Sequence, residues 1–236
     1  MNKKELLHRG KVKSVWLTDD PGLCIAEFSD TITAGDGAKR DELAGKGTLL
    51  NSISSIIFQR LAEKGVENHF VRQLSDTEML VRRAELFALE VVVRNRSAGS
   101  LCRRLGIEPN LVIKPPLVEF FYKNDELGDP LLTKDHIRML ELAEESQVAE
   151  MQKQALAVNQ VLQEIFLAAG LDLVDFKLEF GLAQGQVLLI DEISPDTCRL
   201  WVTGTTESLD KDRFRQGGGD VLAGYREVLR RLEEVK

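Results

Sequence analysis

Cysteine and histidine are scarce in this sequence of 236 residues. The three cysteines, Cys24, Cys102 and Cys198, form no CxxC pair and are too few and too scattered for a disulfide framework. The three histidines lie far apart, without an HExxH or Cys/His cluster, which disfavours a zinc site. Such cysteine usage is typical of a reducing compartment, and we expect a cytoplasmic protein.

Long apolar runs and a surplus of basic charge are also missing. No stretch approaches the ~18–20 apolar residues of a membrane span, and residues 1–7 lack the apolar core of a signal peptide. Acidic residues outnumber basic ones by 38 to 31, which gives a net charge of −7. That balance argues against non-specific binding to nucleic acid or to an anionic membrane, so we expect neither partner.

The charge that is present is unevenly distributed. Residues 1–118 carry 18 basic and 15 acidic side chains, whereas residues 119–236 carry 13 and 23. One half therefore favours anions and the other favours cations. With 43% hydrophobic residues at this length, the chain can bury its own core as one large domain or two small ones.

Hydrophobic patterning predicts a sheet followed by a covering helix in the first ninety residues. Residues 6–17 and 23–28 favour an antiparallel meander, because an Asp-Asp-Pro-Gly turn separates them. Apolar residues at three-and-four spacing favour a helix within 41–64, with Gly65 at its C-cap. Further strands are expected at 66–71, 79–83 and 86–94.

The remaining chain is predicted to add helices and a hairpin. A short helix within 97–105 and a linker-like crossing at 115–122 precede a long helix. We expect that helix to begin with Ser146 as N-cap and to end at Ala169. A hairpin with strands 171–180 and 186–193 and a final helix at 221–234 follow.

The predicted hairpin contains the highest density of candidate functional residues. Strand periodicity places Val174, Phe176, Leu178 and Phe180 on one face and Asp175, Lys177 and Glu179 on the other. Its second strand, 187–190, is apolar on both faces, which predicts a central strand, and it ends in Asp191 and Glu192. A solvated face would also explain the charged row. We favour a divalent cation held against phosphate oxygens, because buried unpaired charge is costly.

Two other segments suit phosphate, although each has an ordinary structural explanation. Lys11 and Lys13 share a strand face beside Gly10, but lysine pairs are more often solvent-exposed. Arg94 to Ser100 leads from a strand into a helix N-terminus, which suits a phosphomonoester but also a simple helix cap. A Walker loop is excluded because Gly47 follows Gly45-Lys46, and no GxGxxG occurs.

Four blocks of sequence carry a family resemblance. They are residues 10–13 (GKVK), 89–100 (LEVVVRNRSAGS), 173–181 (LVDFKLEFG) and 191–201 (DEISPDTCRLW). Their order and spacing resemble the phosphoribosylaminoimidazole-succinocarboxamide synthase (SAICAR synthetase) family, bacterial type. The resemblance implies an ATP-grasp-like α+β fold with antiparallel sheets, an N-terminal lobe at 1–83, a C-terminal lobe at 84–236, and an ATP cleft between them. It also implies two magnesium ions and a homodimer.

The reaction that the resemblance implies joins carboxyaminoimidazole ribonucleotide (CAIR) to L-aspartate, with release of ADP and phosphate. A carboxylate resists attack by an amine, so γ-phosphoryl transfer would first activate it as an acyl phosphate. Such a step needs charge neutralisation more than a nucleophile, which agrees with motifs rich in lysine, arginine and carboxylates.

The resemblance also implies roles for individual residues. The catalytic residues are Lys177 and Asp175, and ATP is bound by Lys11, Lys13, Val15, Val81, Lys123 and Lys177. Magnesium is held by Glu179 and Asp191, and the ribonucleotide by Arg94, Ser100, Asp196 and Arg199. For L-aspartate the candidates are Asp36, Lys39 and Arg215. They come from the stretches 33–40 and 210–215, whose charges could equally serve turns and helix caps.

Two alternatives stay open. A kinase of a small phosphorylated alcohol would need a base beside the acceptor hydroxyl, and nothing between Arg94 and Ser100 supplies one. A catalytically silent nucleotide-binding regulator would not need Lys177, Glu179 and Asp191.

Overall fold

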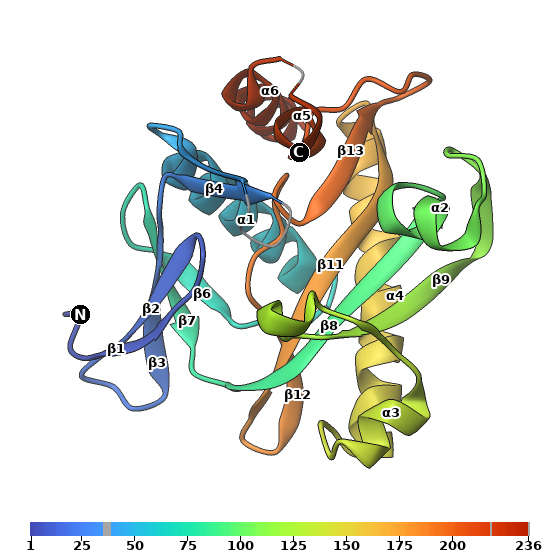
Figure 1. Ribbon diagram of the computed structural model, residues 1–236. Helices are drawn as coiled ribbons and strands as arrows, with labels where there is room; N and C mark the ends of the chain where they lie inside the picture. Colours follow the sequence, from blue (N-terminus) through green and yellow to red (C-terminus); the bar gives the residue numbers. More distant parts are fainter. Residues whose placement is uncertain (35–38, 218, 236) are drawn as a thin grey trace.

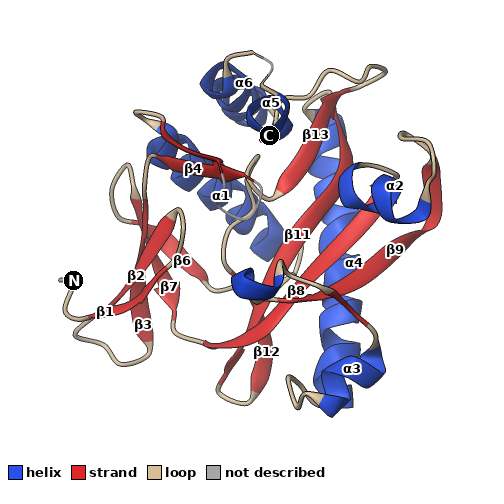
Figure 2. Cartoon of the chain, in the orientation of Figure 1, coloured by secondary structure: helices blue, strands red, loops and turns tan. Residues whose placement is uncertain are grey.

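Two antiparallel sheets form the framework of the protein, whose computed structural model describes residues 1–34, 39–217 and 219–235 (Figures 1 and 2). The first sheet has the order β1-β2-β3-β7-β6. Its strands are β1 (Leu6–Arg9), β2 (Lys13–Leu17), β3 (Leu23–Phe28), β6 (Phe70–Gln73) and β7 (Glu78–Arg82). A separate hairpin is formed by β4 (Thr31–Ala34) and β5 (Lys39–Glu42).

The second sheet has the order β10-β9-β8-β11-β12, and β13 pairs with the first part of β11. Its strands are β8 (Glu85–Arg96), β9 (Val112–Tyr122), β10 (Leu131–Leu132), β11 (Leu171–Ala183), β12 (Gln186–Ile190) and β13 (Cys198–Val202). The helices are α1 (Lys46–Glu63), α2 (Gly99–Leu105), the 3-10 turn η1 (Asp125–Leu127), α3 (Lys134–Met139), α4 (Glu145–Ala168), α5 (Asp212–Gln216) and α6 (Val221–Glu234). None of the helices in the described ranges is long and apolar enough to cross a membrane.

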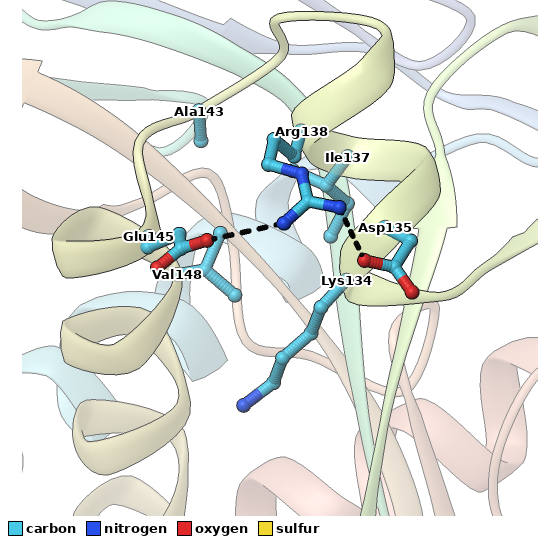
Figure 3. Close-up of a pocket in the computed structure, with 7 residues that line it drawn as sticks. All are labelled: Lys134, Asp135, Ile137, Arg138, Ala143, Glu145 and Val148. Carbon is cyan, nitrogen blue, oxygen red and sulfur yellow. Dashed lines mark hydrogen bonds and ion pairs between the residues drawn. The ribbon is translucent and has the colours of Figure 1, made fainter.

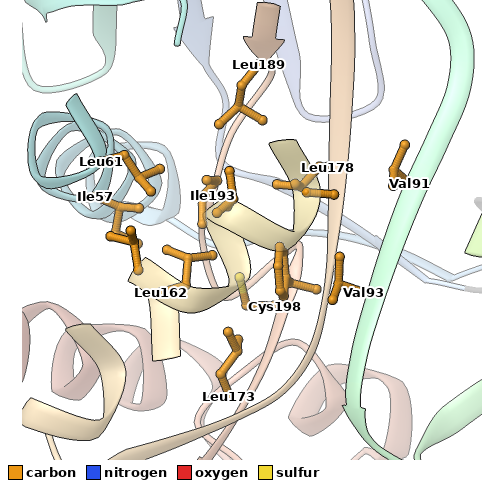
Figure 4. Close-up of a cluster of buried hydrophobic side chains, with 14 of the residues drawn as sticks. Ile57, Leu61, Val91, Val93, Leu162, Leu173, Leu178, Leu189, Ile193 and Cys198 are labelled. Carbon is orange, nitrogen blue, oxygen red and sulfur yellow. The ribbon is translucent and has the colours of Figure 1, made fainter. Parts of the chain in front are cut away.

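The larger hydrophobic core lies where α4 and α1 cover the second sheet. Leu162 of α4, Ile57 of α1 and Val91 of β8 are all inaccessible to solvent and belong to this one cluster (Figure 4). A smaller core joins β3 and β7 to Leu50 of α1 and Tyr225 of α6. The chain passes from the first sheet to the second between Arg82 and Glu85. Both hydrophobic cores, however, contain residues from before and after residue 83, so the lobe boundary there stays a prediction.

Several predicted elements are confirmed and others need correction. The final helix has the predicted bounds, and the long helix ends within a residue of its prediction. The prediction of Ser146 as its N-cap is wrong, because Glu144 occupies the N-cap position and forms a capping box with Gln147. The linker-like crossing at 115–122 is instead part of β9, which pairs with β8 along most of its length. Residues 41–42 belong to β5 and not to the first long helix. Strands β4, β5, β10 and β13 and helices α3 and α5 were not foreseen.

The predicted hairpin forms, with two differences. The strand at 187–190 is not central: β12 lies at the end of the sheet order. Its apolar character reflects cover from the N-terminal region, since Asn68 forms a parallel bridge with Leu189 and the His69 amide donates to the Leu189 carbonyl at 2.9 Å. A bulge between Leu173 and Asp175 shifts the alternation, so Val174 packs with Ala98 and Trp201, apart from the main core.

Candidate active site

A cleft of about 1840 Å³ is lined by residues of both sheets. Its wall on the first sheet includes an apolar row, in which Val15 pairs with Ala26 and Cys24 pairs with Val81. The connection from β7 to β8, residues 82–85, forms part of the lining as well. An apolar surface beside an extended chain segment suits a flat aromatic base.

Lys177 is the centre of a charged cluster at one end of the cleft. On β11, Lys177 and Glu179 share a face, and the Lys177 ammonium lies 2.6 Å from Glu179 and 3.0 Å from Glu90 on β8. Asp191, at the end of β12, lies 3.7 Å away. Burial alone would lower the pKa of Lys177, but these three carboxylates raise it well above its usual value, so Lys177 is a permanent cation.

Two further lysines complete this cluster. Lys13 of β2 pairs with Asp191, and Lys123, directly after β9, lies 2.5 Å from Glu179. Burial would raise the pKa of Asp191, but Lys13, Lys177 and Lys123 hold it far below its usual range. Both sheets therefore supply lysines to the same two carboxylates, and all of these side chains line the cleft.

The two carboxylates meet the requirements of magnesium. Among the described residues no group of three or more His, Cys, Asp or Glu side chains is arranged to hold a metal ion. Mg²⁺, however, is usually bound by one or two carboxylates together with substrate phosphates and water. Glu179 and Asp191, which face the cleft between lysines, supply that ligand set.

The predicted ribonucleotide end is built over a second charged group. Arg94 is 2% exposed and donates to Asp175 at 2.7 Å and to Ser100 at 3.1 Å. Asp175 is 3% exposed and also accepts from Arg199 at 2.8 Å. Ser100 and Arg199 line the cleft, whereas Arg94 and Asp175 lie beneath its surface. A Cβ built at Gly99 would lie 2.4 Å from Arg199, so only glycine leaves room for this guanidinium.

A fully buried lysine supports Asp196. Lys46, at the start of α1, has no exposed surface and donates to one oxygen of Asp196 at 2.8 Å, while the Tyr225 hydroxyl donates to the other. Burial would raise the pKa of Asp196, but Lys211 and Lys46 lower it. Burial and Asp196 raise the pKa of Tyr225 well above its usual value, so the phenol remains a donor. Asp196 itself borders the cleft.

The candidates for L-aspartate lie at the α5 end of the cleft. Lys39 and Arg215 both line it. Lys39 also donates to the Phe214 carbonyl at 2.6 Å and lies 4.1 Å from the centre of the Phe214 ring, which fixes β5 to α5. Asp36 lies outside the described residues.

The structure thus brings most of the predicted site together. The predicted residues that line the cleft are Lys11, Lys13, Val15, Lys39, Val81, Ser100, Lys123, Lys177, Glu179, Asp191, Asp196, Arg199 and Arg215. Sequence reasoning missed Lys46 and Tyr225, which hold Asp196, and Glu90, which holds Lys177. The sequence signal for Glu90 was a carboxylate within an apolar strand. The structure places it opposite Glu179 in the register of β8 and β11.

A second, smaller pocket does not contribute to this site. It measures about 290 Å³ and lies between α3 and α4 (Figure 3). Arg138 crosses it and pairs with Asp135 at 2.8 Å and with Glu145 at 3.6 Å. These three side chains are mostly exposed, as expected of a surface ion-pair network.

Comparison with known proteins identifies the family. Residues 6–232 match the family model described as SAICAR synthetase. The chain belongs to the SAICAR synthetase family. SAICAR synthetases are ATP-dependent ligases of purine biosynthesis. The resemblance of the four sequence blocks and the ATP-grasp-like α+β fold are thereby confirmed.

Individual SAICAR synthetases align with nearly the whole chain. The phosphoribosylaminoimidazole-succinocarboxamide synthase of Shouchella clausii is 52% identical over 98% of each chain. That of Synechococcus is 54% identical over 97% of this chain and 94% of its own. Among solved structures, the enzyme from Ehrlichia chaffeensis has a TM-score of 0.94 at 41% identity and covers 98% of this chain and 100% of its own. A SAICAR synthetase in complex with ADP has a TM-score of 0.93 at 40% identity, over 98% and 99%.

Proposed function

We propose that this protein joins CAIR to L-aspartate with cleavage of ATP to ADP and phosphate, through an acyl phosphate of the CAIR carboxylate. The observation that carries the proposal is the convergence of Lys13, Lys123 and Lys177 on Glu179 and Asp191 at one end of the cleft. Phosphoryl transfer depends on positioning and charge neutralisation, and this cluster supplies both.

The lysines of the cluster bind and orient the polyphosphate. When ATP is absent, their three positive charges are balanced by Glu179, Asp191 and Glu90, so phosphate oxygens would compete for ammonium groups that are already partly desolvated. Lys11 pairs with Asp125 at 2.8 Å near the rim of the cleft and is the most exposed of the predicted ATP-binding lysines. Val15 and Val81 face the cleft in the apolar row and would contact the adenine.

Glu179 and Asp191 would hold Mg²⁺. The ion would supply further neutralisation of the phosphate charge, and the proposal includes it as the form in which ATP binds. The lysines of the cluster cannot bind a cation, and the remaining carboxylate, Glu90, pairs with Lys177 at 3.0 Å.

Other residues of the cleft lining would receive the two other substrates. Ser100, Asp196 and Arg199 face the cleft and would contact the ribonucleotide, while Lys39 and Arg215 would contact L-aspartate. Arg94 and Asp175 lie beneath the surface, and the geometry favours an orienting role for both over direct contact. Lys177 is the residue that we propose as catalytic, because it lies between both carboxylates.

A coupled ADP assay with each substrate omitted in turn tests the proposed reaction. We expect ADP only when ATP, CAIR and L-aspartate are all present. If CAIR carries an ¹⁸O-labelled carboxylate, the label should appear in the released phosphate, and unlabelled phosphate would rule out the acyl phosphate. ADP formed with a simple alcohol in place of L-aspartate would instead favour the kinase.

Glu179→Gln tests the metal assignment. The variant should lose most activity while its far-UV circular dichroism stays native, because glutamine keeps the shape but removes the charge that holds the cation. Glu164→Gln, an exposed change on α4, is the matched control. Wild-type turnover in Glu179→Gln would contradict the assignment.

We propose a homodimer, as the resemblance implies, which light scattering on the purified protein would test. The cysteines are unpaired, with Cys24 and Cys198 buried, which supports a reducing cytoplasmic location that fluorescence microscopy of a tagged protein would test.

A further inference from the structure

Seven charged side chains form a continuous chain of ion pairs that runs from α2 to α5. In order they are Arg104, Glu119, Arg94, Asp175, Arg199, Asp212 and Arg215, with alternating sign. Several members are nearly inaccessible to solvent, whereas Arg199 and Arg215 border the cleft. The chain of ion pairs therefore connects residues proposed to bind two different substrates.

Asp212 is the link between these two arginines. Arg199 donates through Nε to Asp212 Oδ2 at 2.8 Å, and Arg215 donates through Nη1 to Asp212 Oδ1. Burial would raise the pKa of Asp212, but Arg199 and Arg215 lower it, so the carboxylate keeps its charge. One carboxylate thus orients both guanidinium groups.

The position of Asp212 is itself fixed by the backbone around it. Asp210 accepts from the Asp212 amide at 2.7 Å and from the Leu200 amide of β13 at 2.8 Å. The Lys211 amide donates to the Pro195 carbonyl at 3.0 Å. Since the start of α5 is attached to β13 and to the loop that precedes it, Asp212 cannot simply follow a guanidinium that moves.

Arg199 has one nitrogen left for a ligand. Asp175 accepts from its Nη1 and Asp212 from its Nε, while Nη2 makes no hydrogen bond with the residues that the structure describes and lies against Gly99. Without Asp212 the guanidinium could rotate about its remaining partner, Asp175. Binding through Nη2 would then require ordering of the side chain, which lowers affinity.

We infer that Asp212 is a positioning residue that couples the ribonucleotide end of the cleft to the L-aspartate end, by orienting Arg199 and Arg215 together. The inference rests on the proposed function, which assigns one arginine to each substrate. It predicts that the loss of this single carboxylate, which does not line the cleft, weakens the binding of both substrates.

Steady-state kinetics of Asp212→Asn test the inference. Hydrogen bonds to charged groups contribute ~1.5–3 kcal/mol, so the KM values for CAIR and for L-aspartate should each rise about tenfold or more. The KM for ATP should stay within about twofold, because the ion-pair chain does not include the lysine cluster. Arg199→Lys should raise chiefly the KM for CAIR, and Arg215→Lys chiefly that for L-aspartate.

A matched control separates this effect from general loss of charge near α5. Glu207 pairs with Arg213 at 3.2 Å, is largely exposed and does not line the cleft. Glu207→Gln should therefore leave all three KM values unchanged. An Asp212→Asn variant that behaves like Glu207→Gln, or that raises only one KM, would overturn the inference.

Asp212→Glu keeps the experiment decisive if the asparagine variant is unstable. Glutamate retains the charge, so both KM values should shift by smaller and parallel factors, and unequal shifts would overturn the inference. Absence of three-substrate-dependent ADP formation by the wild type would overturn the proposed function as well. An active wild type with an unresponsive Asp212→Asn would overturn the coupling alone.

Discussion

Replacing Gly99 with alanine tests whether Arg199 must keep its observed position. Gly99 has φ +54°, and the added Cβ would lie 2.4 Å from Arg199 Nη2 and 2.7 Å from Cζ. Ordinary contacts begin near 3.4 Å, so the guanidinium would have to retreat by about 1 Å. Its hydrogen bonds to Asp175 and Asp212, both 2.8 Å, cannot survive that movement unchanged.

Two costs of this substitution can be separated by magnitude. A non-glycine residue in the left-handed region costs ~1–2 kcal/mol, which for a chain of this size lowers the Tm by about 2–8 °C. Loss of one charge-assisted hydrogen bond between Arg199 and the ribonucleotide should weaken ribonucleotide binding by ~1.5–3 kcal/mol. The KM for CAIR should therefore rise roughly 10- to 100-fold.

Gly106→Ala is the matched control for Gly99→Ala. Gly106 ends the same helix with φ +62°, and a Cβ there would meet nothing within 4 Å among the described residues. Gly99→Ala should lose at least as much thermal stability as Gly106→Ala, because the clash with Arg199 adds to the shared backbone cost, and only Gly99→Ala should raise the KM for CAIR. Equal KM values in the two variants, or a normal KM in Gly99→Ala, would refute the reasoning.

Three further predictions concern buried polar groups. Tyr225→Phe removes a hydrogen bond to Asp196 and should lower the free energy of unfolding in urea by ~1.5–3 kcal/mol, so an unchanged value would contradict the role of the hydroxyl. Lys46→Met leaves Asp196 without its closest cation and should cost ~3–5 kcal/mol in the same measurement, whereas a loss under ~1 kcal/mol would be inconsistent with a buried pair. Burial and Asp212 raise the pKa of Asp210 from 3.8 to about 6, so the folded protein retains a proton that the unfolded chain releases. This contribution to stability is therefore fully present below pH ~4 and is lost as the pH rises to ~6, by about 3 kcal/mol. Asp210→Asn should remove that slope, and parallel pH profiles of wild type and variant would contradict the assignment.

The sequence predicted an element correctly where the residues of that element alone determine its structure. Helix α6 has the predicted bounds because its apolar residues repeat with the helical period and Asp220 caps it. Prediction from the sequence failed where contacts with residues remote in sequence determine whether an element is buried. An apolar run such as β12 reads as a central strand, and only contact with residues 68–69 shows how an edge strand is covered. The bulge at Leu173 likewise interrupts an alternation that the sequence presents as regular.

The candidate site depended on the family resemblance, since its partners are remote in sequence. Lys13 and Asp191 lie 178 positions apart, and Lys46 and Asp196 lie 150 apart. No periodicity connects such pairs. In the sequence Lys46 stands in a Gly-Lys-Gly stretch that indicates no role for it, whereas in the structure Gly47 allows α1 to begin against the backbone of Phe28. The side chain of Lys46, the first residue of α1, is thereby directed toward Asp196.

Helix α1 contributes buried side chains to both hydrophobic cores, with Leu50 in the smaller one and Ile57 in the larger. A rigid opening of the cleft about residues 82–85 would therefore pull one helix out of one of its two cores. The unfolding of either lobe removes packing from the other, so the whole chain should melt in a single calorimetric transition. A fragment that ends at residue 83 would expose the face of α1 that carries Ile57, which makes α1 the element that joins two sheets into one folding unit.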